Sequence, residues 1–270
     1  MYVVACIKQV PDTTLVQIDP FTDTLVSDGS PCIINPCDSN ALEESVRIKE
    51  RYGLKVAALS MGPANAETML RKALARGADQ AVLVCDRAFG GADTLATSCV
   101  LAAALRKLSQ DEQVGLVFCG TQTIDGFSAQ VGPGLAVRLG FSQLTLVDRI
   151  EELDLQAGKI RVRRRLEGGY EVAQAKLPAL VTVVPGLNRP RYPTVPMRLW
   201  AEEEEIRVWD NGHLKLDVDS IGLLGSPTRV SRIYAPQRSQ GEVLGDGVQE
   251  PSRSARLLVE RLLARDLLAL

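Results

Sequence analysis

The sequence is poor in the side chains that most enzymes use to make and break bonds. Its 270 residues include one histidine, His213, which lies in a polar Asn-Gly-His turn. Ser-His-Asp catalysis, Cys-His catalysis and histidine-rich metal sites are therefore nearly excluded. The six cysteines never form a Cys-x-x-Cys pair, so we interpret them as free thiols in a reducing compartment. We predict no catalytic residue and no metal site.

Nucleic-acid binding and membrane insertion are also poorly supported. The net charge is −2 at pH 7 and aromatic residues make up 4% of the chain, which argues against electrostatic or stacking contacts to nucleic acid. No apolar run approaches the ~20 residues of a membrane span, and the first residues do not resemble a signal peptide. We expect a cytoplasmic protein with no membrane span and no nucleic-acid partner.

The chain does contain a regular alternation of short apolar runs and helical patterns. The pattern predicts strands at 3–8, 55–60, 80–85, 114–119 and 143–150, with helices at 39–52, 64–76, 93–108 and before 139. Asp38 or Asn40 is the expected N-cap of the first helix, and Gly53 its end. Strands that alternate with helices predict an α/β fold, a parallel sheet with helices on both faces.

The second part of the chain has a different character. It predicts a hairpin at 159–165 and 170–176, an apolar strand at 179–184, a proline-fixed extended segment and a terminal amphipathic helix at 252–269. A smaller hairpin is expected at 16–19 and 24–27. We divide the chain into a nucleotide-binding domain, 1–186, and a C-terminal arm, 187–270, that docks on another subunit.

Glycine-rich loops follow several of the predicted strands. The stretch 120–134 leads from a strand into a helix, an arrangement that points backbone N–H groups at an anion. It has neither a Walker lysine nor the G-x-G-x-x-G spacing, so by itself it could also be an ordinary turn. All such loops emerge at one rim of a parallel sheet, where ligands bind. The sequence therefore predicts a nucleotide or another phosphate-bearing ligand.

A series of short motifs, in order, resembles the beta subunit of electron-transfer flavoproteins. The motifs are Lys8-Gln-Val-Pro-Asp12, Asn35-Pro-x-Asp38, Ser60-Met-Gly-Pro63, Ala75-Arg-Gly-Ala-Asp79, Thr123-Ile-Asp-Gly126, Gln130-Val-Gly132, Leu177-Pro-Ala179 and Leu187-Asn-x-Pro-Arg-Tyr192. The resemblance implies an adenine-nucleotide alpha-hydrolase-like fold and a heterodimer with an alpha subunit that carries FAD. It also implies that the segment 187–195, with Leu187, Arg189 and Tyr192, binds an acyl-CoA dehydrogenase-like partner.

The resemblance also implies where the cofactor binds. Nucleotide contacts are expected at Cys6, Asn35, Pro36, Cys37, Asp38, Met61, Thr123, Ile124, Asp125, Gly126, Ser128, Gln130, Val131, Gly132 and Gly134. The loop 86–98 and the late motif 222–228 resemble the electron-bifurcating members, in which the site holds FAD. Flavin contacts are therefore expected at Asp86, Gly90, Gly91, Asp93, Thr94 and Thr97.

From this resemblance we expect an electron-transfer subunit that takes hydride from NADH. It would pass electrons to the alpha-subunit FAD and a dehydrogenase, and to ferredoxin or flavodoxin. One alternative is a non-bifurcating beta subunit that holds structural AMP. A second is a stand-alone nucleotide-binding α/β protein, against which the long C-terminal arm argues.

Overall fold

The fold is built on a sheet whose strands run mostly parallel. The computed structural model describes residues 1–12, 31–230 and 241–267. Within these residues the main sheet has nine strands in the order β11-β5-β4-β1-β6-β10-β7-β8-β9, and β2 pairs with β3 in a small antiparallel sheet. The strands are β1 (Tyr2–Cys6), β2 (Gln9–Pro11), β3 (Cys32–Ile34), β4 (Lys55–Met61), β5 (Gln80–Val84), β6 (Val114–Gly120), β7 (Ser142–Asp154), β8 (Lys159–Leu166), β9 (Gly169–Lys176), β10 (Ala179–Val183) and β11 (Ile206–Trp209).

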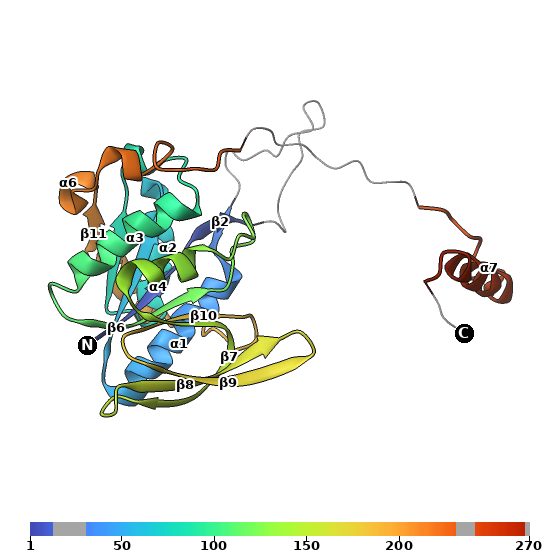
Figure 1. Cartoon of the computed structure of the whole chain (residues 1–270), viewed down its shortest axis with the longest axis horizontal. Helices are drawn as coiled ribbons and strands as arrows, with labels where there is room; N and C mark the ends of the chain where they lie inside the picture. The colour runs from blue at the N-terminus through green and yellow to red at the C-terminus, as the bar shows by residue number, and fades with distance from the viewer. Residues whose placement is uncertain (13–30, 231–240, 268–270) are drawn as a thin grey trace. The chain divides into compact units, whose positions relative to one another are not determined.

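Helices cover both faces of the sheet, so the predicted fold class is confirmed (Figure 1). Buried residues of α1, α2 and α5 join one core cluster, and those of α3 and α4 join the other. The helices are α1 (Pro36–Tyr52), α2 (Glu67–Ala75), α3 (Thr94–Leu108), α4 (Val131–Leu139), α5 (Val195–Glu203), α6 (Asn211–Leu214) and α7 (Pro251–Leu263). Among the strand pairs of the main sheet in the described residues, only β7–β8 and β8–β9 are antiparallel.

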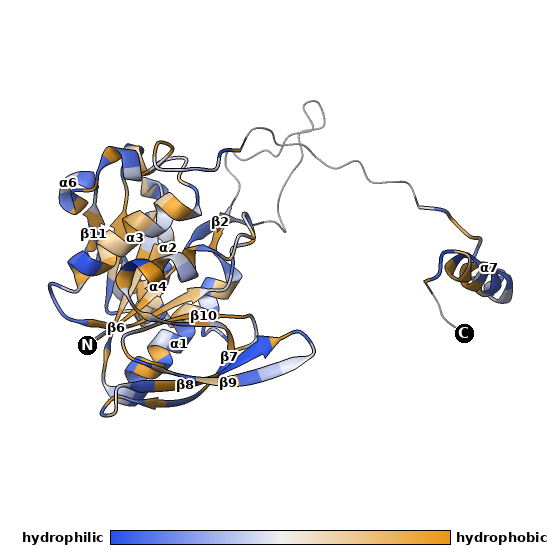
Figure 2. Ribbon diagram, viewed as in Figure 1, coloured by the Kyte–Doolittle hydropathy of each residue, from blue (hydrophilic) through white to orange (hydrophobic). Residues whose placement is uncertain are grey.

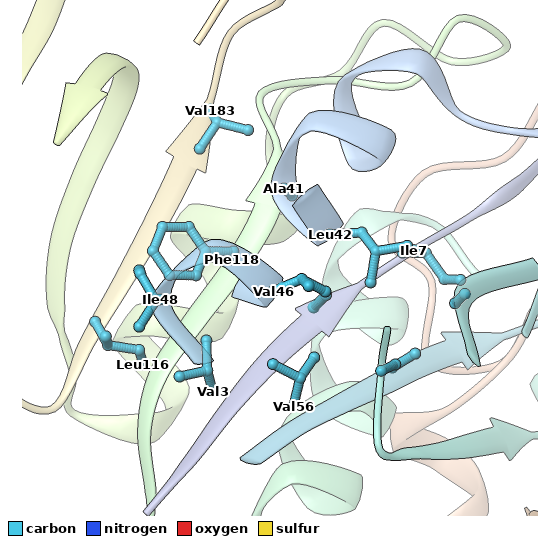
Figure 3. Close-up of a cluster of buried hydrophobic side chains, with 14 of the residues drawn as sticks. Val3, Ile7, Ala41, Leu42, Val46, Ile48, Val56, Leu116, Phe118 and Val183 are labelled. Atoms are coloured by element: carbon cyan, nitrogen blue, oxygen red, sulfur yellow. The ribbon is translucent and has the colours of Figure 1, made fainter. Parts of the chain in front are cut away.

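The alternation of side chains along the central strands divides the core between the two faces. Figure 3 shows Leu42 and Val46 of α1 in one buried cluster with Val3 of β1 and Phe118 of β6, and Leu42 lies beside Ile7. Burying each such side chain contributes about 1.5–3 kcal/mol. In Figure 2 the central strands are mainly apolar, whereas the tip of the β8–β9 hairpin is hydrophilic. The core therefore lies on either side of the parallel strands and fixes the rim formed by their ends.

Several helix boundaries differ from those predicted. The helix α1 starts at Pro36, with Asn35 at the N-cap position, so the expectation that Asp38 or Asn40 caps it is wrong. Proline is well tolerated at the first helical position, and the Asp38 side chain is used elsewhere. A 3₁₀ turn, η1 (Ala64–Ala66), precedes α2. The left-handed Gly53 ends α1 as expected, and the hairpin expected at 16–27 lies outside the described residues.

Part of the chain beyond residue 186 returns to the sheet. The strand β11 pairs in parallel with β5, and α5 packs on α2. Two short elements, α6 and the 3₁₀ turn η3 (Val218–Ser220), follow β11 in the chain. Met1–Ser231 form one compact unit. The functional division at 186/187 stays a prediction.

Residues 232–270 form a second unit, in which α7 is the described helix. None of its side chains is buried, and its apolar and hydrophilic residues occupy different sides (Figure 2). Glu242 and Arg261 form an ion pair of 2.7 Å within the unit. None of the helices in the described ranges combines the length and hydropathy that a transmembrane span requires.

Candidate functional site

A cleft of about 830 Å³ opens where the strand order of the sheet reverses. From β1 the chain continues to β4 and β5 on one side, and β6 lies on the other side of β1. The loops that leave β1 and β6 therefore diverge, which is where parallel α/β sheets bind ligands. The lining comes mainly from segments 6–11, 59–65, 89–101, 119–132 and 228–230. The rim predicted from the strand–helix alternation is thus one continuous cleft.

Two buried polar side chains at the start of α1 brace the floor of this cleft. Asp38, which is 4% exposed, accepts hydrogen bonds from the backbone N–H groups of Lys8 (2.9 Å) and Gly120 (2.8 Å). Asn35 donates a hydrogen bond to the carbonyl of Gln122 (2.9 Å) and accepts one from the backbone N–H of Ile124 (3.2 Å). The Asn-Pro-x-Asp motif therefore ties the loops after β1 and β6 to α1.

We expect the Asp38 carboxyl to keep its proton up to about neutral pH. Burial raises its pKa to about 7, although hydrogen bonds from Asn35, Gly120 and Lys8 oppose the rise. Because the folded-state pKa lies above the ordinary 3.8, the stability linked to this proton is fully present at acid pH. This stability is lost as the pH rises from the ordinary pKa of 3.8 through the folded-state pKa of about 7. Carbon-13 NMR should show one carboxyl titrating near pH 7 that disappears in Asp38→Asn; a signal titrating near pH 4 would contradict this.

The first turn of α4 forms a wall of the cleft and has no side-chain cap. Its N-cap residue Gln130 makes no capping hydrogen bond, and Gln130, Val131 and Gly132 all line the cleft. A Cβ atom added at Gly132 would lie 2.6 Å from Cγ2 of Thr182. Only glycine therefore lets the helix start so close to the sheet. The positive end of the helix dipole and the first N–H groups favour an anion such as a phosphate here.

The start of α3, on another wall, carries a negative charge of its own. The Asp93 carboxylate caps the helix by accepting two N–H groups of the first turn (2.9 and 3.0 Å). Gly91, with a left-handed φ of 70°, precedes it, and the hydroxyl-bearing Thr94 and Thr97 line the cleft. This wall therefore offers hydroxyl groups and a tight backbone turn, which suit an uncharged part of a ligand.

The loop between β6 and α4 has an unusual backbone. Phe127 and Ala129 have φ values of 50° and 54°, in the left-handed region that residues other than glycine seldom adopt. The N–H of Phe127 donates to the carbonyl of Thr123 (2.9 Å), and the Phe127 side chain is 64% exposed. Strained backbone of this kind costs about 1–3 kcal/mol per residue and clusters at binding sites. The loop shape agrees with a ligand-binding role.

The cleft is better suited to binding than to acid–base chemistry. Burial raises the pKa of Cys6 to about 12 and that of Cys119 well above its ordinary value, so both stay protonated thiols. His213 lies outside the cleft lining and pairs with Asp210 at 2.6 Å. No group of His, Cys, Asp and Glu among the described residues could hold a metal ion.

Most of the predicted cofactor contacts meet in this one cleft. Those that line it are Cys6, Asp38, Met61, Gly91, Asp93, Thr94, Thr97, Thr123, Gly126, Ser128, Gln130, Val131 and Gly132. Their convergence from the ends of β1, β4 and β6 and the starts of α3 and α4 follows from the parallel sheet.

The other predicted contacts do not line the cleft. They are Asn35, Pro36, Cys37, Asp86, Gly90, Ile124, Asp125 and Gly134. Asp86 instead accepts hydrogen bonds from the N–H groups of Ala88 and Asn211 (both 2.9 Å), and so joins the end of β5 to α6. A Cβ at Gly134 would lie 3.0 Å from Oγ of Ser98, so this glycine serves the contact between α3 and α4. Asp86 and Gly134 therefore have bracing contacts, and cofactor contact at all eight positions stays a prediction.

The cleft also includes residues that the sequence did not single out as ligand contacts. Lys8 lines it, and its ammonium pairs with Asp125 at 2.6 Å across the rim. A lysine directly after the first strand is a signal that could have identified it. Thr228 and Val230 line the cleft from far along the chain, where no local pattern indicates such proximity.

The segment expected to bind a partner is fixed at its base and exposed at its tip. Tyr192 is 91% exposed and Arg189 is also exposed, whereas Leu187 is partly buried against the core. Val195 and Leu199 of α5 add two exposed apolar side chains that the sequence did not single out. The exposed side chains form the part of this segment that a partner can reach.

The fold and the cleft together define a class, an α/β protein with a nucleotide-type site at the switch point of its sheet. The model of the electron transfer flavoprotein domain matches residues 22–213. The chain is 44% identical over 265 residues to Protein FixA of Azotobacter vinelandii, covering 97% of this chain and 94% of that protein. It is 46% identical over 251 residues to the electron transfer flavoprotein subunit beta of Clostridium acetobutylicum (93% and 94% covered). With the caffeyl-CoA reductase-Etf complex subunit CarD of Acetobacterium woodii it shares 45% identity over 242 residues (89% and 90% covered).

This chain belongs to the electron transfer flavoprotein family. The relatives confirm the resemblance to beta subunits that the ordered motifs indicate, and they support the bifurcating type that the loop 86–98 and the motif 222–228 resemble.

Proposed function

We propose that this chain is the beta subunit of a cytoplasmic, heterodimeric, electron-bifurcating flavoprotein and that its cleft binds FAD. In this proposal an alpha subunit carries a second FAD, and NADH is the hydride donor. Electrons pass to an acyl-CoA dehydrogenase-like flavoenzyme and to ferredoxin or flavodoxin. The observation that carries the proposal is the cleft itself, in which the uncapped start of α4 and the glycine turn before α3 both line one space of about 830 Å³.

The volume of the cleft favours FAD over AMP as its occupant. It lies in the upper part of the ~300–1,000 Å³ range of small-molecule sites. AMP would need the phosphate site at α4 and an adenosine pocket beside it. It would leave the wall formed by Gly91, Thr94 and Thr97 without a ligand. A single-flavin shuttle that holds structural AMP remains the second candidate, because the uncapped start of α4 alone satisfies a mononucleotide phosphate.

The residues of this chain bind and orient the cofactor rather than transfer protons. The start of α4, with Gln130 and Gly132, would hold the diphosphate, and Thr94 and Thr97 would meet uncharged hydroxyls. Asp38 keeps the surrounding loops in register through its two backbone hydrogen bonds. When bound, the flavin would supply the chemistry of hydride acceptance and one-electron transfer.

The proposal is tested by the cofactor content of the complex as it is purified from its natural source. We expect two FAD molecules per heterodimer, found by extraction and chromatography, and bleaching of the flavin absorbance by NADH. One FAD together with one AMP per heterodimer would favour the single-flavin alternative. If the chain expressed without an alpha subunit proved a well-behaved, flavin-free monomer that binds adenine nucleotide, the stand-alone alternative would be favoured instead.

A further inference from the structure

A turn late in the compact unit packs against the loop that leads into α3. Gly222 has a left-handed φ of 54°, and a Cβ added to it would lie 2.0 Å from the carbonyl oxygen of Ala88. Leu223, the next residue, would lie 3.4 Å from a Cβ added at Gly91. Backbone meets backbone here, so the turn 221–228 is fitted to the loop 88–91 and cannot shift without moving it.

Two hydroxyl groups of this turn hold Asp93. The buried Ser226 accepts a hydrogen bond from the Asp93 N–H (2.8 Å) and donates to the carbonyl of Gly222 (2.6 Å). Thr228 donates to one carboxylate oxygen of Asp93 through both its hydroxyl (2.8 Å) and its N–H (3.1 Å). We call this arrangement of Ser226, Thr228 and Asp93 the Asp93 clamp.

The clamp leaves the Asp93 carboxylate fully hydrogen-bonded. One oxygen caps α3 and the other accepts both bonds from Thr228. Although burial alone would raise the pKa of Asp93, the bonds from Ala96, Thr228 and Leu95 hold it below its ordinary value. Without the Thr228 hydroxyl, the second carboxylate oxygen would lose one of its two donors, and without the Ser226 hydroxyl the Asp93 N–H would lose its acceptor. The loop 88–91 would also lose its anchor.

We propose that Ser226 and Thr228 are positioning residues that set the shape and charge of the α3 wall and so determine how tightly the cleft holds its cofactor. This inference rests on the proposed function for the identity of the cofactor, but not for the existence of the clamp. The chemistry predicts that the ligand part beside Asp93 is uncharged.

The test uses the co-expressed heterodimer with the double substitution Ser226→Ala and Thr228→Val, which removes both hydroxyl groups at nearly constant volume. We expect the beta-site cofactor to dissociate about tenfold faster or more, as expected from the loss of hydrogen bonds to a charged group. We also expect its flavin absorbance spectrum to shift. Thr228→Ser alone, which keeps the hydroxyl, should hold the cofactor nearly as firmly as the wild type does. Ser109→Ala is the matched control, because its hydroxyl bonds Val114 at the opposite end of α3 (3.3 Å).

The outcomes separate this inference from the proposed function. If the wild-type site holds AMP and the double variant releases AMP as slowly as the wild type, the inference fails together with the FAD assignment. If the site holds AMP and the double variant releases it faster, the clamp stands and only the FAD assignment fails. If the site holds FAD and the double variant keeps it as firmly as Ser109→Ala does, the clamp is overturned and the FAD assignment stands. A site that holds neither nucleotide would overturn both.

Discussion

Replacing Gly120 by alanine should destabilise the compact unit by about 3–5 kcal/mol and release the cofactor that we propose for the cleft. Gly120 ends β6 directly beneath the cleft. A Cβ at this position would lie 2.4 Å from Oδ1 of Asp38, 2.5 Å from Cβ of Cys37 and 2.9 Å from the Asp38 nitrogen. The chain must move to make room, and the hydrogen bond from the Gly120 N–H to Asp38 (2.8 Å) is broken as it does so.

This destabilisation is a large fraction of the total, because small domains have only about 5–15 kcal/mol of unfolding free energy. Thermal unfolding and FAD content of the purified heterodimer measure it. Gly169→Ala is the matched control. It is also at the end of a strand, but nothing lies within 4 Å of an added Cβ and its φ is not left-handed. Equal melting temperatures for Gly120→Ala and Gly169→Ala would show that the floor of the cleft is not rigid.

Much of the fold follows from local signals in the sequence. Continuous apolar runs mark the buried parallel strands, and Asp93 and Gly53 mark the start and end of their helices as predicted. The sheet order at its edges does not follow in this way. The strand β10 lies between β6 and β7, and β11 extends the opposite edge beside β5. Only four residues form β11, and two of them, Arg207 and Val208, are exposed. No apolar pattern therefore predicts this strand.

The site is predictable where its residues are near one another in the sequence, and much less so where they are far apart. The loops after β1, β4 and β6 can be placed together from the strand–helix alternation alone. Motif matching, however, does not separate residues that face the ligand from those that brace the loops. The side chains of Asn35 and Asp86, for example, do not line the cleft and bond to distant backbone groups. The contact between Thr228 and Asp93 spans 135 positions, and only the folded structure reveals it.

Replacing Arg191 by methionine should uncouple the chain from the dehydrogenase-like partner of the proposed function while leaving the proposed beta-site cofactor in place. Arg191 donates to Glu43 through its Nε (2.9 Å) and its own backbone N–H (3.0 Å), and it also pairs with Glu50. Glu43 is 5% exposed. Because Arg191 is itself one-third exposed, we expect the free energy of unfolding to fall by about 2–3 kcal/mol. Removing one partner of a fully buried ion pair costs ~3–5 kcal/mol.

The functional effect follows from where Arg191 stands in the chain. Arg191 attaches the segment 187–195 to α1 directly beside the exposed Tyr192. Reciprocal hydrogen bonds between Asn40 of α1 and Asn188 attach the start of the same segment. Without Arg191 a partner must first order the segment, at about 1–2 kcal/mol per residue. We therefore expect electron transfer to the dehydrogenase to fall at least about tenfold, while flavin reduction by NADH is unchanged.

The pH dependence distinguishes the ion pair from a loss of packing. Although burial raises it, the hydrogen bonds from Arg191 and Arg47 hold the pKa of Glu43 below its ordinary 4.5. The stability from this carboxylate is therefore present above that pH and is lost as the pH falls through the lowered value. In Arg191→Met the ionised Glu43 is left poorly paired, so the stability gap to the wild type should narrow below pH 4.5. Arg207→Met, which breaks an exposed pair with Asp111, should be nearly neutral at every pH. A constant gap for Arg191→Met would mean that the side chain acts through packing and not through its charge.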